Sequence, residues 1–358
     1  MAYQTKAALL RHLLDAPGIV RVAGAHDALA ALVAEEVGYD AVWASSLAIS
    51  ASRGLPDMSL LTMTDYLQAA GYINDVCGCP VIADCDTGFG NTVNVAFMVR
   101  QYETAGVAAV CIEDKVFPKR NSFVQTEQVL EDVDVFARKI EVAKRTQRNP
   151  DFVVIARTEA AIAGLGVDEA LRRAHRYVDA GADAILMHSK SRQPDEVLDF
   201  CQRWRCRAPV VVVPTTYYDW HVDDAAKAGV SMVIYANQAL RASVSAMGRA
   251  LRTTLSNGSS VPVEADIAST SAANTPASAA ASQIAAASAR SGSAPTMTAS
   301  PRCPDTATLA SLTTTSQRWY GCPPTDSVSS TSIVAAAGAA RTVTSVCART
   351  RSASATNG

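Results

Sequence analysis

The chain has 358 residues, 49% of them apolar, so one barrel-sized domain with a large core plus a tail accounts for its length. Its formal net charge of -2 argues against a nucleic-acid-binding surface, so a few placed cations must hold any anionic ligand. No stretch reaches the roughly 20 apolar residues of a membrane span, and the N-terminus lacks the apolar run of a signal peptide. We therefore expect a soluble, cytoplasmic protein without membrane or nucleic-acid partners.

The composition changes sharply near Ser256. Charged and apolar residues interleave up to this point, whereas 259–358 contain no lysine and consist largely of Ala, Ser and Thr. Such a segment buries too little apolar surface to offset its ordering entropy. We predict a barrel domain at 1–255 and a mostly disordered tail at 256–358. A shifted reading frame in a GC-rich gene is an alternative origin for this tail.

Apolar strands alternate with helical patterns along the first part of the chain. Four of the strands follow a glycine that ends a helix, as Gly38 and Gly106 do. The apolar runs are continuous, which is typical of parallel strands covered on both faces. The predicted strands are 19–22, 41–43, 81–83, 109–112, 152–156, 184–187, 210–213 and 232–235. Eight such units favour a closed (β/α)8 TIM barrel over a doubly wound open sheet.

Acidic residues follow two neighbouring predicted strands. Asp84 and Asp86 come at the end of the third strand and Glu113 at the end of the fourth, where barrels of this kind carry their chemistry. Clustered carboxylates repel one another without a cation, and hard oxygen ligands suit Mg2+, so we predict a magnesium site here. The alternative is that Asp84 and Asp86 only cap the helix that begins near Asn91.

Potential cations follow the next two strands. Arg157 ends the fifth strand and His188 the sixth, and together they could hold an oxyanion such as phosphate or carboxylate. The other histidines fall on predicted helices or loops, and we interpret them as structural. The nine cysteines include no C-x-x-C pair, which favours buried free thiols.

Four segments resemble the phosphoenolpyruvate mutase/isocitrate lyase superfamily, within a similarity that runs from about 18 to 250. They are 43–47 (WASSL), 84–91 (DCDTGFGN), 113–122 (EDKVFPKRNS) and 184–190 (AILMHSK). The C–C lyases of this superfamily carry an acid/base Cys and a His in one loop, where this chain has Lys119, Arg120, Asn121 and Ser122. Lyase activity is therefore not expected. Asn121 matches the mutases, whereas phosphonopyruvate hydrolases carry Thr at this position.

The resemblance implies a reaction, a cofactor and partners. The expected reaction interconverts phosphoenolpyruvate and phosphonopyruvate by moving a metaphosphate-like group between oxygen and carbon of the pyruvate enolate. Mg2+ is the implied cofactor, and a homo-oligomer, dimer or tetramer, is expected. A downstream phosphonopyruvate decarboxylase would draw the uphill reaction forward. The alternatives are phosphonopyruvate hydrolysis, a mutase acting on a carboxylated relative, and a catalytically impaired barrel.

The resemblance also assigns roles to residues. Asp84 would bind Mg2+ directly, while Asp86 and Glu113 would hold its waters. The residues implied in catalysis are Asp57, Lys119 and Asn121, with Asp57 facing the phosphoryl group as nucleophile or electrostatic guide. Those implied to contact the substrate are Trp43, Ser45, Ser46, Leu47, Asn121, Ser122, Arg157 and His188.

Two features of the implied site concern its shape. Lys119 lies on a loop between Phe117 and Phe123 that is expected to close over the substrate as a lid. Ser46 stands where mutases usually have Gly, and we expect its side chain to crowd the pocket for the substrate carboxylate.

Overall fold

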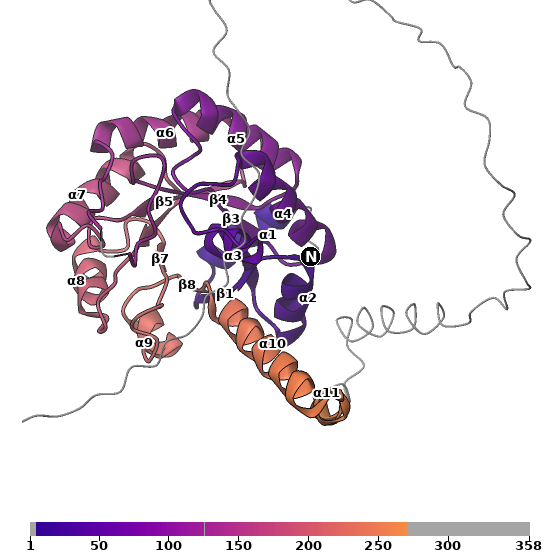
Figure 1. The fold of residues 1–358 in the computed structure, drawn as a ribbon. Helices are drawn as coiled ribbons and strands as arrows, with labels where there is room; N and C mark the ends of the chain where they lie inside the picture. The colour runs from indigo at the N-terminus through magenta and orange to yellow at the C-terminus, as the bar shows by residue number, and fades with distance from the viewer. Residues whose placement is uncertain (1–4, 125, 271–358) are drawn as a thin grey trace, which may run out of the picture. The chain divides into compact units, whose positions relative to one another are not determined.

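A computed structural model describes residues 5–124 and 126–270, and its core is a closed barrel of eight parallel strands (Figure 1). The strands follow one another around the barrel in chain order, and β1 closes the ring by pairing with β8. Their bounds are β1 Val20–Ala25, β2 Ala41–Ala44, β3 Val81–Asp84, β4 Ala109–Glu113, β5 Val153–Thr158, β6 Ala184–Met187, β7 Val210–Val212 and β8 Met232–Tyr235. The predicted TIM barrel is confirmed, and the open-sheet alternative is wrong.

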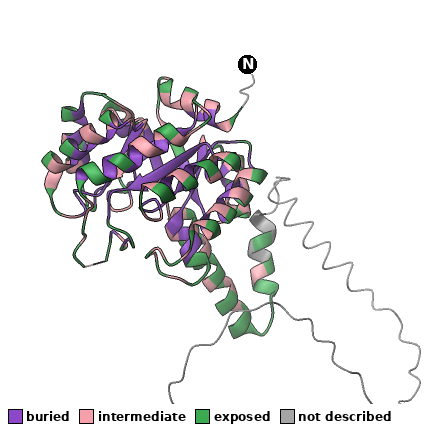
Figure 2. Ribbon diagram, turned by 90° about the horizontal axis from the view of Figure 1, so that it is seen from above, coloured by how far each residue is buried: buried purple, intermediate pink, exposed green. Residues whose placement is uncertain are grey.

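Helices surround the strands and bury their outer faces, so that the strands are enclosed while the helices carry the exposed residues (Figure 2). Their bounds are α1 Lys6–Asp15, α2 Ala28–Val37, α3 Ser46–Ser52, α4 Met63–Val76, α5 Thr92–Thr104, α6 Val133–Thr146, α7 Gly166–Asp179, α8 Asp195–Trp204, α9 Val222–Lys227, α10 Gln238–Asn257 and α11 Val261–Thr270. None of the helices in the described ranges is long and apolar enough to cross a membrane.

Two apolar clusters explain why the strand sequences are continuously apolar. One fills the barrel interior with residues such as Ile82, Ile155 and Leu186, which alternate with residues that point outward. The other lies between strands and helices and includes Val154 and Phe136. Because both strand faces are buried, polar side chains gather where the strands end, and Arg21, exposed near the start of β1, is an exception.

Local sequence signals set where the helices begin and end. Gly38 ends α2 with φ 95°, a left-handed conformation that glycine adopts without steric cost. Thr62 and Asp65 form a capping box at the start of α4, because each side chain bonds the backbone N–H of the other. The cap of α4 lies on the side of the barrel mouth, after β2, whereas Gly38 lies at the opposite end of the barrel, where the chain enters β2.

The C-terminal part of the described chain extends past the predicted domain boundary. α10 contains residue 255, where the barrel domain is predicted to end, and α11 follows within the predicted tail. Residues 271–358, and with them most of the predicted disorder, lie outside the described residues. The barrel and its mouth, which hold the candidate site, lie wholly within the described part.

Candidate active site

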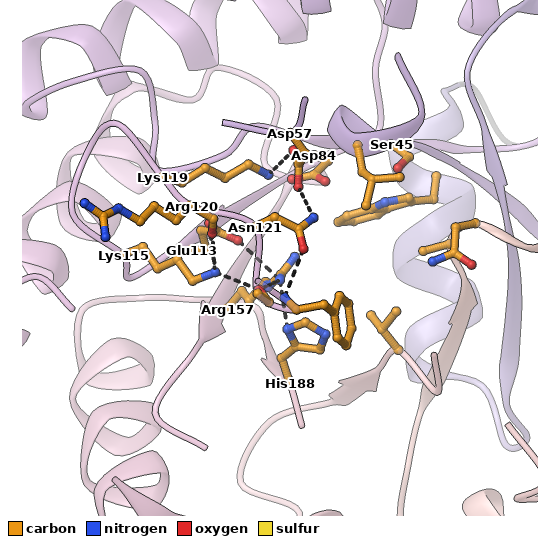
Figure 3. A pocket seen from close by; sticks show the side chains of 17 residues that line it. Ser45, Asp57, Asp84, Glu113, Lys115, Lys119, Arg120, Asn121, Arg157 and His188 are labelled. Atoms are coloured by element: carbon orange, nitrogen blue, oxygen red, sulfur yellow. Dashed lines mark hydrogen bonds and ion pairs between the residues drawn. The ribbon is translucent and has the colours of Figure 1, made fainter. Parts of the chain in front are cut away.

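A pocket lies at the carboxyl ends of the strands (Figure 3). Its lining residues are Trp43, Ser45, Leu47, Asp57, Asp84, Glu113, Lys115, Lys119, Arg120, Asn121, Ser122, Phe123, Arg157, His188, Val213, Ala236 and Asn237. Every predicted site residue except Ser46 and Asp86 belongs to this lining. The strand ends therefore bring the predicted acidic and cationic side chains to one place.

The two exceptions lie directly behind the lining. Ser46 is fully buried at the start of α3, where its hydroxyl donates to Asp84 Oδ2 at 2.7 Å and accepts from Lys119 Nζ at 2.9 Å. Asp86 is fully buried, with φ 48°, and its Oδ2 accepts from Ser59 Oγ at 2.9 Å. The Ser46 side chain is thus engaged by its neighbours, and it acts on the pocket through Asp84 and Lys119.

Lys119 extends from the lid into a group of four carboxylates, which we call the acidic cluster: Asp57, Asp84, Asp86 and Glu113. Its ammonium nitrogen lies 2.7 Å from Asp86 Oδ1 and 2.9 Å from Asp57 Oδ1. Burial and the nearby charges of Asp84, Asp57 and Glu113 raise the pKa of Asp86 to about 6, despite the opposing charge of Lys119. The cluster therefore carries more negative charge than one lysine balances.

The acidic cluster has the makings of a cation site. Among the described residues, Glu113 Oε1 is a buried carboxylate oxygen that accepts no hydrogen bond and has only Lys115 Nζ, 3.9 Å away, as an ion-pair partner, whereas Asp86 Oδ1 is paired with Lys119. Asp84 keeps 7% of its surface exposed, at the pocket wall. Within the described ranges no three such side chains converge as direct metal ligands. This donor set fits an ion held by one carboxylate, with water between it and the other two, as Mg2+ is commonly held.

The capping interpretation of Asp84 and Asp86 is wrong. The N-cap of α5 is Asn91, whose side chain accepts from Val93 N, and Asn94 returns a bond to the Asn91 backbone. Asp84 instead accepts from Ser46, and Asp86 contacts Lys119 and Ser59. The two acids are therefore available to the pocket rather than to the helix.

Arg157 and His188 lie next to each other, and Arg157 also contacts the acidic residue Glu113. Arg157 Nη2 is 2.8 Å from His188 Nδ1 and 3.3 Å from Glu113 Oε2. Burial lowers the pKa of both side chains, but Glu159 and Glu113 raise that of Arg157 well above its ordinary value. Arg157 is thus a fixed positive charge in the pocket wall, suited to a phosphate or carboxylate.

The lid residues contact both sides of the pocket. Asn121 Nδ2 donates to Asp57 Oδ2 at 2.9 Å, and its Oδ1 accepts from the Phe123 backbone at 2.9 Å. The Phe123 ring meets the His188 ring edge-on at 5.8 Å. Lys119 and Ser122 are almost fully buried, so the loop covers the pocket in this structure. Burial would raise the pKa of Asp57, but Lys119 and Asn121 hold it below its ordinary value.

Two charged residues at the site were given no role by the sequence. Lys115 Nζ lies 2.9 Å from Glu159 Oε2, and both side chains are buried. The available signal was their position at the ends of the fourth and fifth strands. Nothing in the sequence indicated that the two side chains point toward each other.

Fold and site together define a (β/α)8-barrel enzyme whose acidic and cationic strand ends face one pocket beneath a lid. A family model described as phosphoenolpyruvate phosphomutase matches 10–255, and the chain belongs to this family. A phosphoenolpyruvate phosphomutase of Tetrahymena pyriformis is 42% identical over 264 residues, which cover 74% of this chain and 88% of the relative.

Solved structures agree with this assignment. A phosphoenolpyruvate phosphomutase of Streptomyces platensis subsp. rosaceus has a TM-score of 0.71 and 55% identity, covering 72% of this chain and 90% of its own. A phosphonopyruvate hydrolase in complex with oxalate and Mg2+ also has a TM-score of 0.71, with 39% identity, and covers 80% and 99%. Both chemistries thus occur among proteins similar to this one.

Proposed function

We propose that this protein is a magnesium-dependent phosphoenolpyruvate phosphomutase, which interconverts phosphoenolpyruvate and phosphonopyruvate. The observation that supports the proposal is the position of Asn121, the loop residue that matches the mutases. Its amide donates to Asp57 at 2.9 Å, within the buried mouth of the pocket. A mutase must keep the transferring phosphoryl group from water, and a lid amide held in this way supports that requirement.

The acidic side of the pocket is the proposed magnesium site. Asp84 would bind Mg2+ directly, and Asp86 and Glu113 would hold water bound to it. When bound, the ion supplies positive charge beside the pyruvate oxygens, where the enolate charge develops. Trp43, Ser45 and Leu47, which line this side of the pocket, would hold the pyruvate part.

The cationic side of the pocket is the proposed phosphoryl site. Arg157, His188, Ser122 and Asn121 would bind the phosphoryl oxygens while the P–C bond breaks and the P–O bond forms. Asp57 is ionised under the influence of Lys119 and Asn121, which suits a nucleophile or an electrostatic guide equally. The short path of the phosphoryl group between carbon and oxygen needs fixed donors more than proton transfer.

A 31P NMR assay with phosphonopyruvate and Mg2+ tests this proposal. A mutase produces phosphoenolpyruvate, whereas phosphonopyruvate hydrolase, the activity of the 39% identical structural relative, produces inorganic phosphate alone. Inorganic phosphate without phosphoenolpyruvate would defeat the mutase assignment, and no turnover would leave an impaired barrel. Asp84→Ala is the control, because loss of the direct metal ligand should abolish either reaction.

A homo-oligomer is also proposed, on the evidence of α10. This 20-residue helix has no buried residue, although Val244, Met247, Leu251 and Leu255 repeat at helical spacing on one side. Their exposed fractions are between 56% for Met247 and 86% for Leu255. A stripe of this kind supports a dimer or tetramer in which it packs against another copy.

The remaining proposals concern cellular context. The six cysteines in the described part of the chain are free thiols, which supports a reducing cytoplasmic location. Phosphonopyruvate formation is uphill, so a phosphonopyruvate decarboxylase that consumes the product would make the mutase direction productive.

A further inference from the structure

A buried carboxylate lies behind the pocket and contacts four of its residues. Glu159 directly follows β5, has no exposed surface and does not line the pocket itself. Its Oε1 lies 2.5 Å from Arg157 Nε and 2.6 Å from His188 Nδ1. Its Oε2 lies 2.9 Å from Lys115 Nζ and accepts from Ser122 Oγ at 2.7 Å. One side chain therefore connects two strand ends with the lid.

The charge of Glu159 determines what these contacts are. Burial alone would raise its pKa, but Arg157, His188 and Lys115 together hold the pKa well below its ordinary value. An ionised carboxylate can only accept hydrogen bonds, so its 2.6 Å contact assigns a hydrogen to Nδ1 of His188. Arg157 Nη2, a donor 2.8 Å from the same Nδ1, then has Ser122 Oγ and Glu113 Oε2, each 3.3 Å away, as its acceptors. The Nε2 atom of the same ring is then the nitrogen left for the pocket.

Glu159 is itself anchored from the side away from the pocket. Its backbone N–H donates to Asp114 Oδ1 at 2.8 Å. Asp114 Oδ2 in turn accepts from Tyr177 Oη at 2.7 Å and from Arg173 Nη1 at 3.1 Å. These two side chains belong to α7, so a barrel helix fixes the backbone from which Glu159 extends.

The lid is attached through the same carboxylate. Lys115 Nζ donates to Ser122 Oγ at 2.6 Å and to the Arg120 carbonyl at 2.9 Å, while Ser122 Oγ donates to Glu159. Both ends of this chain of contacts are buried, which makes each charge-assisted bond stronger than at the surface. An open lid would leave Glu159 and Lys115 with fewer partners in a buried site.

We propose that Glu159 is a positioning residue for phosphoryl binding: it orients Arg157 and His188 and holds the lid closed through Ser122, without touching the substrate. The inference deepens the proposed function and rests on it, because these partners are the proposed phosphoryl ligands. A side chain that binds a ligand can rotate or tilt when no hydrogen-bond partner holds it from behind. At metal sites, the loss of such a partner lowers metal affinity or activity about 10- to 100-fold. A similar cost is expected here, confined to the phosphoryl end of the ligand.

The first test uses the wild-type protein and needs no turnover. 15N NMR of histidine-labelled protein above about pH 8 reports which ring nitrogen carries the hydrogen, and His188→Asn identifies the signal among the five histidines. At this pH the ring is neutral, since burial lowers the pKa of His188. The proposal requires the Nδ1–H form, and an Nε2–H form would overturn it.

The second test compares two inhibitors on matched variants. Glu159→Gln keeps the shape but removes the charge, Glu159→Asp keeps the charge, and Glu36→Gln removes an exposed carboxylate on α2 as the control. 3-Sulfopyruvate probes both ends of the pocket, whereas oxalate probes only the pyruvate end. In Glu159→Gln, Ki for sulfopyruvate should rise about tenfold or more while Ki for oxalate stays within about twofold.

The outcomes separate positioning from folding and from function. Glu159→Asp should recover part of the sulfopyruvate binding, which a loss of stability would not predict. Equal weakening of both inhibitors, or of neither, contradicts the positioning role. If Glu159→Gln does not fold, the His188 tautomer in the wild-type protein and the two Ki values of Glu159→Asp still test the positioning role. Failure of the 31P NMR assay on wild type would reject the proposed function, yet leave the tautomer of His188, which is measured without turnover, to be judged by itself.

Discussion

The ammonium of Lys119 lies 2.7 Å from the carboxylate of Asp86, so a lid side chain ends inside the acidic cluster of the barrel. Burial lowers the pKa of Lys119, but Asp86 and Asp57 raise it well above its ordinary value. The lysine is therefore charged and neutralises part of the cluster. It occupies the neighbourhood in which a divalent cation is proposed to bind.

Lys119→Met should separate metal binding from turnover. Without the tethered ammonium, Mg2+ meets less repulsion, so its affinity measured by titration calorimetry should rise about tenfold. Turnover should fall about a hundredfold or more, because the lid loses its contact with Asp57 and Asp86. Arg120→Met removes an exposed charge one residue along the lid and should leave Mg2+ affinity nearly unchanged. Unchanged affinity in Lys119→Met would mean that the lysine does not compete with the metal.

Magnesium should stabilise the protein more at neutral than at acidic pH. The pKa of Asp86 in the folded protein is about 6, above its ordinary value of 3.8, so the folded metal-free protein binds this proton more tightly than the unfolded chain. This proton binding stabilises the folded metal-free protein below about pH 3.8, and the stabilisation is lost as the pH rises through about 6. Protons and Mg2+ compete for the same carboxylates.

Melting temperatures with and without Mg2+ check this expectation. A Mg2+ concentration a hundred times its Kd adds about 2.7 kcal/mol to the free energy of unfolding. This gain should be present near pH 7.5 and much reduced near pH 5, whereas in Asp86→Asn it should vary less over the same range. A stabilisation that is independent of pH would show that Asp86 is not linked to the metal.

Asn121→Thr should change the fate of the phosphoryl group. The substitution removes the amide that donates to Asp57 and the oxygen that accepts from Phe123, so the lid is held less tightly. More inorganic phosphate relative to phosphoenolpyruvate is expected in the 31P NMR assay, by about tenfold in ratio. Asn121→Gln, which keeps the amide, serves as the comparison. A product ratio equal to that of wild type would contradict the role given to this residue.

Leu251→Glu should dissociate the proposed oligomer. Leu251 is 71% exposed in the middle of the apolar stripe of α10, and a charge there cannot be buried without several kcal/mol of cost. Light scattering coupled to size exclusion should report a smaller mass than for wild type. Ala246→Glu, on another side of the same helix, is the control and should not change the mass. A wild-type protein that is already monomeric would refute the oligomer outright.

The sequence predicted the fold and most of the site because both depend on strand ends. Asp84, Glu113, Arg157 and His188 each stand at or directly after the end of a buried strand, so they could be expected near one another at the barrel mouth. Asp57, on the loop before α4, and Asn121, on the lid, were identified only through the family resemblance. Their contact, from segments 64 residues apart, has no periodic signature in the chain.

The parts that the sequence did not reveal depend on side-chain direction. Glu159 stands two residues after Arg157, yet its carboxylate turns back to meet it, which spacing alone does not determine. Ser46 was expected to crowd the pocket, whereas its hydroxyl is taken up by Asp84 and Lys119. In both cases several donors and acceptors competed for one partner, and the three-dimensional arrangement selected among them.

The division of labour between strand ends and lid has a consequence for how new chemistries can arise. The strands and helices of the barrel hold the buried charged side chains, which lower the stability of the fold unless they are paired, together with the residues that pair with them. The lid contributes a handful of residues that decide whether water reaches the reacting group, and it carries little of the core. A few substitutions in such a loop can therefore redirect the reaction while the scaffold keeps its stability, which makes 117–123 the natural segment to vary in directed evolution.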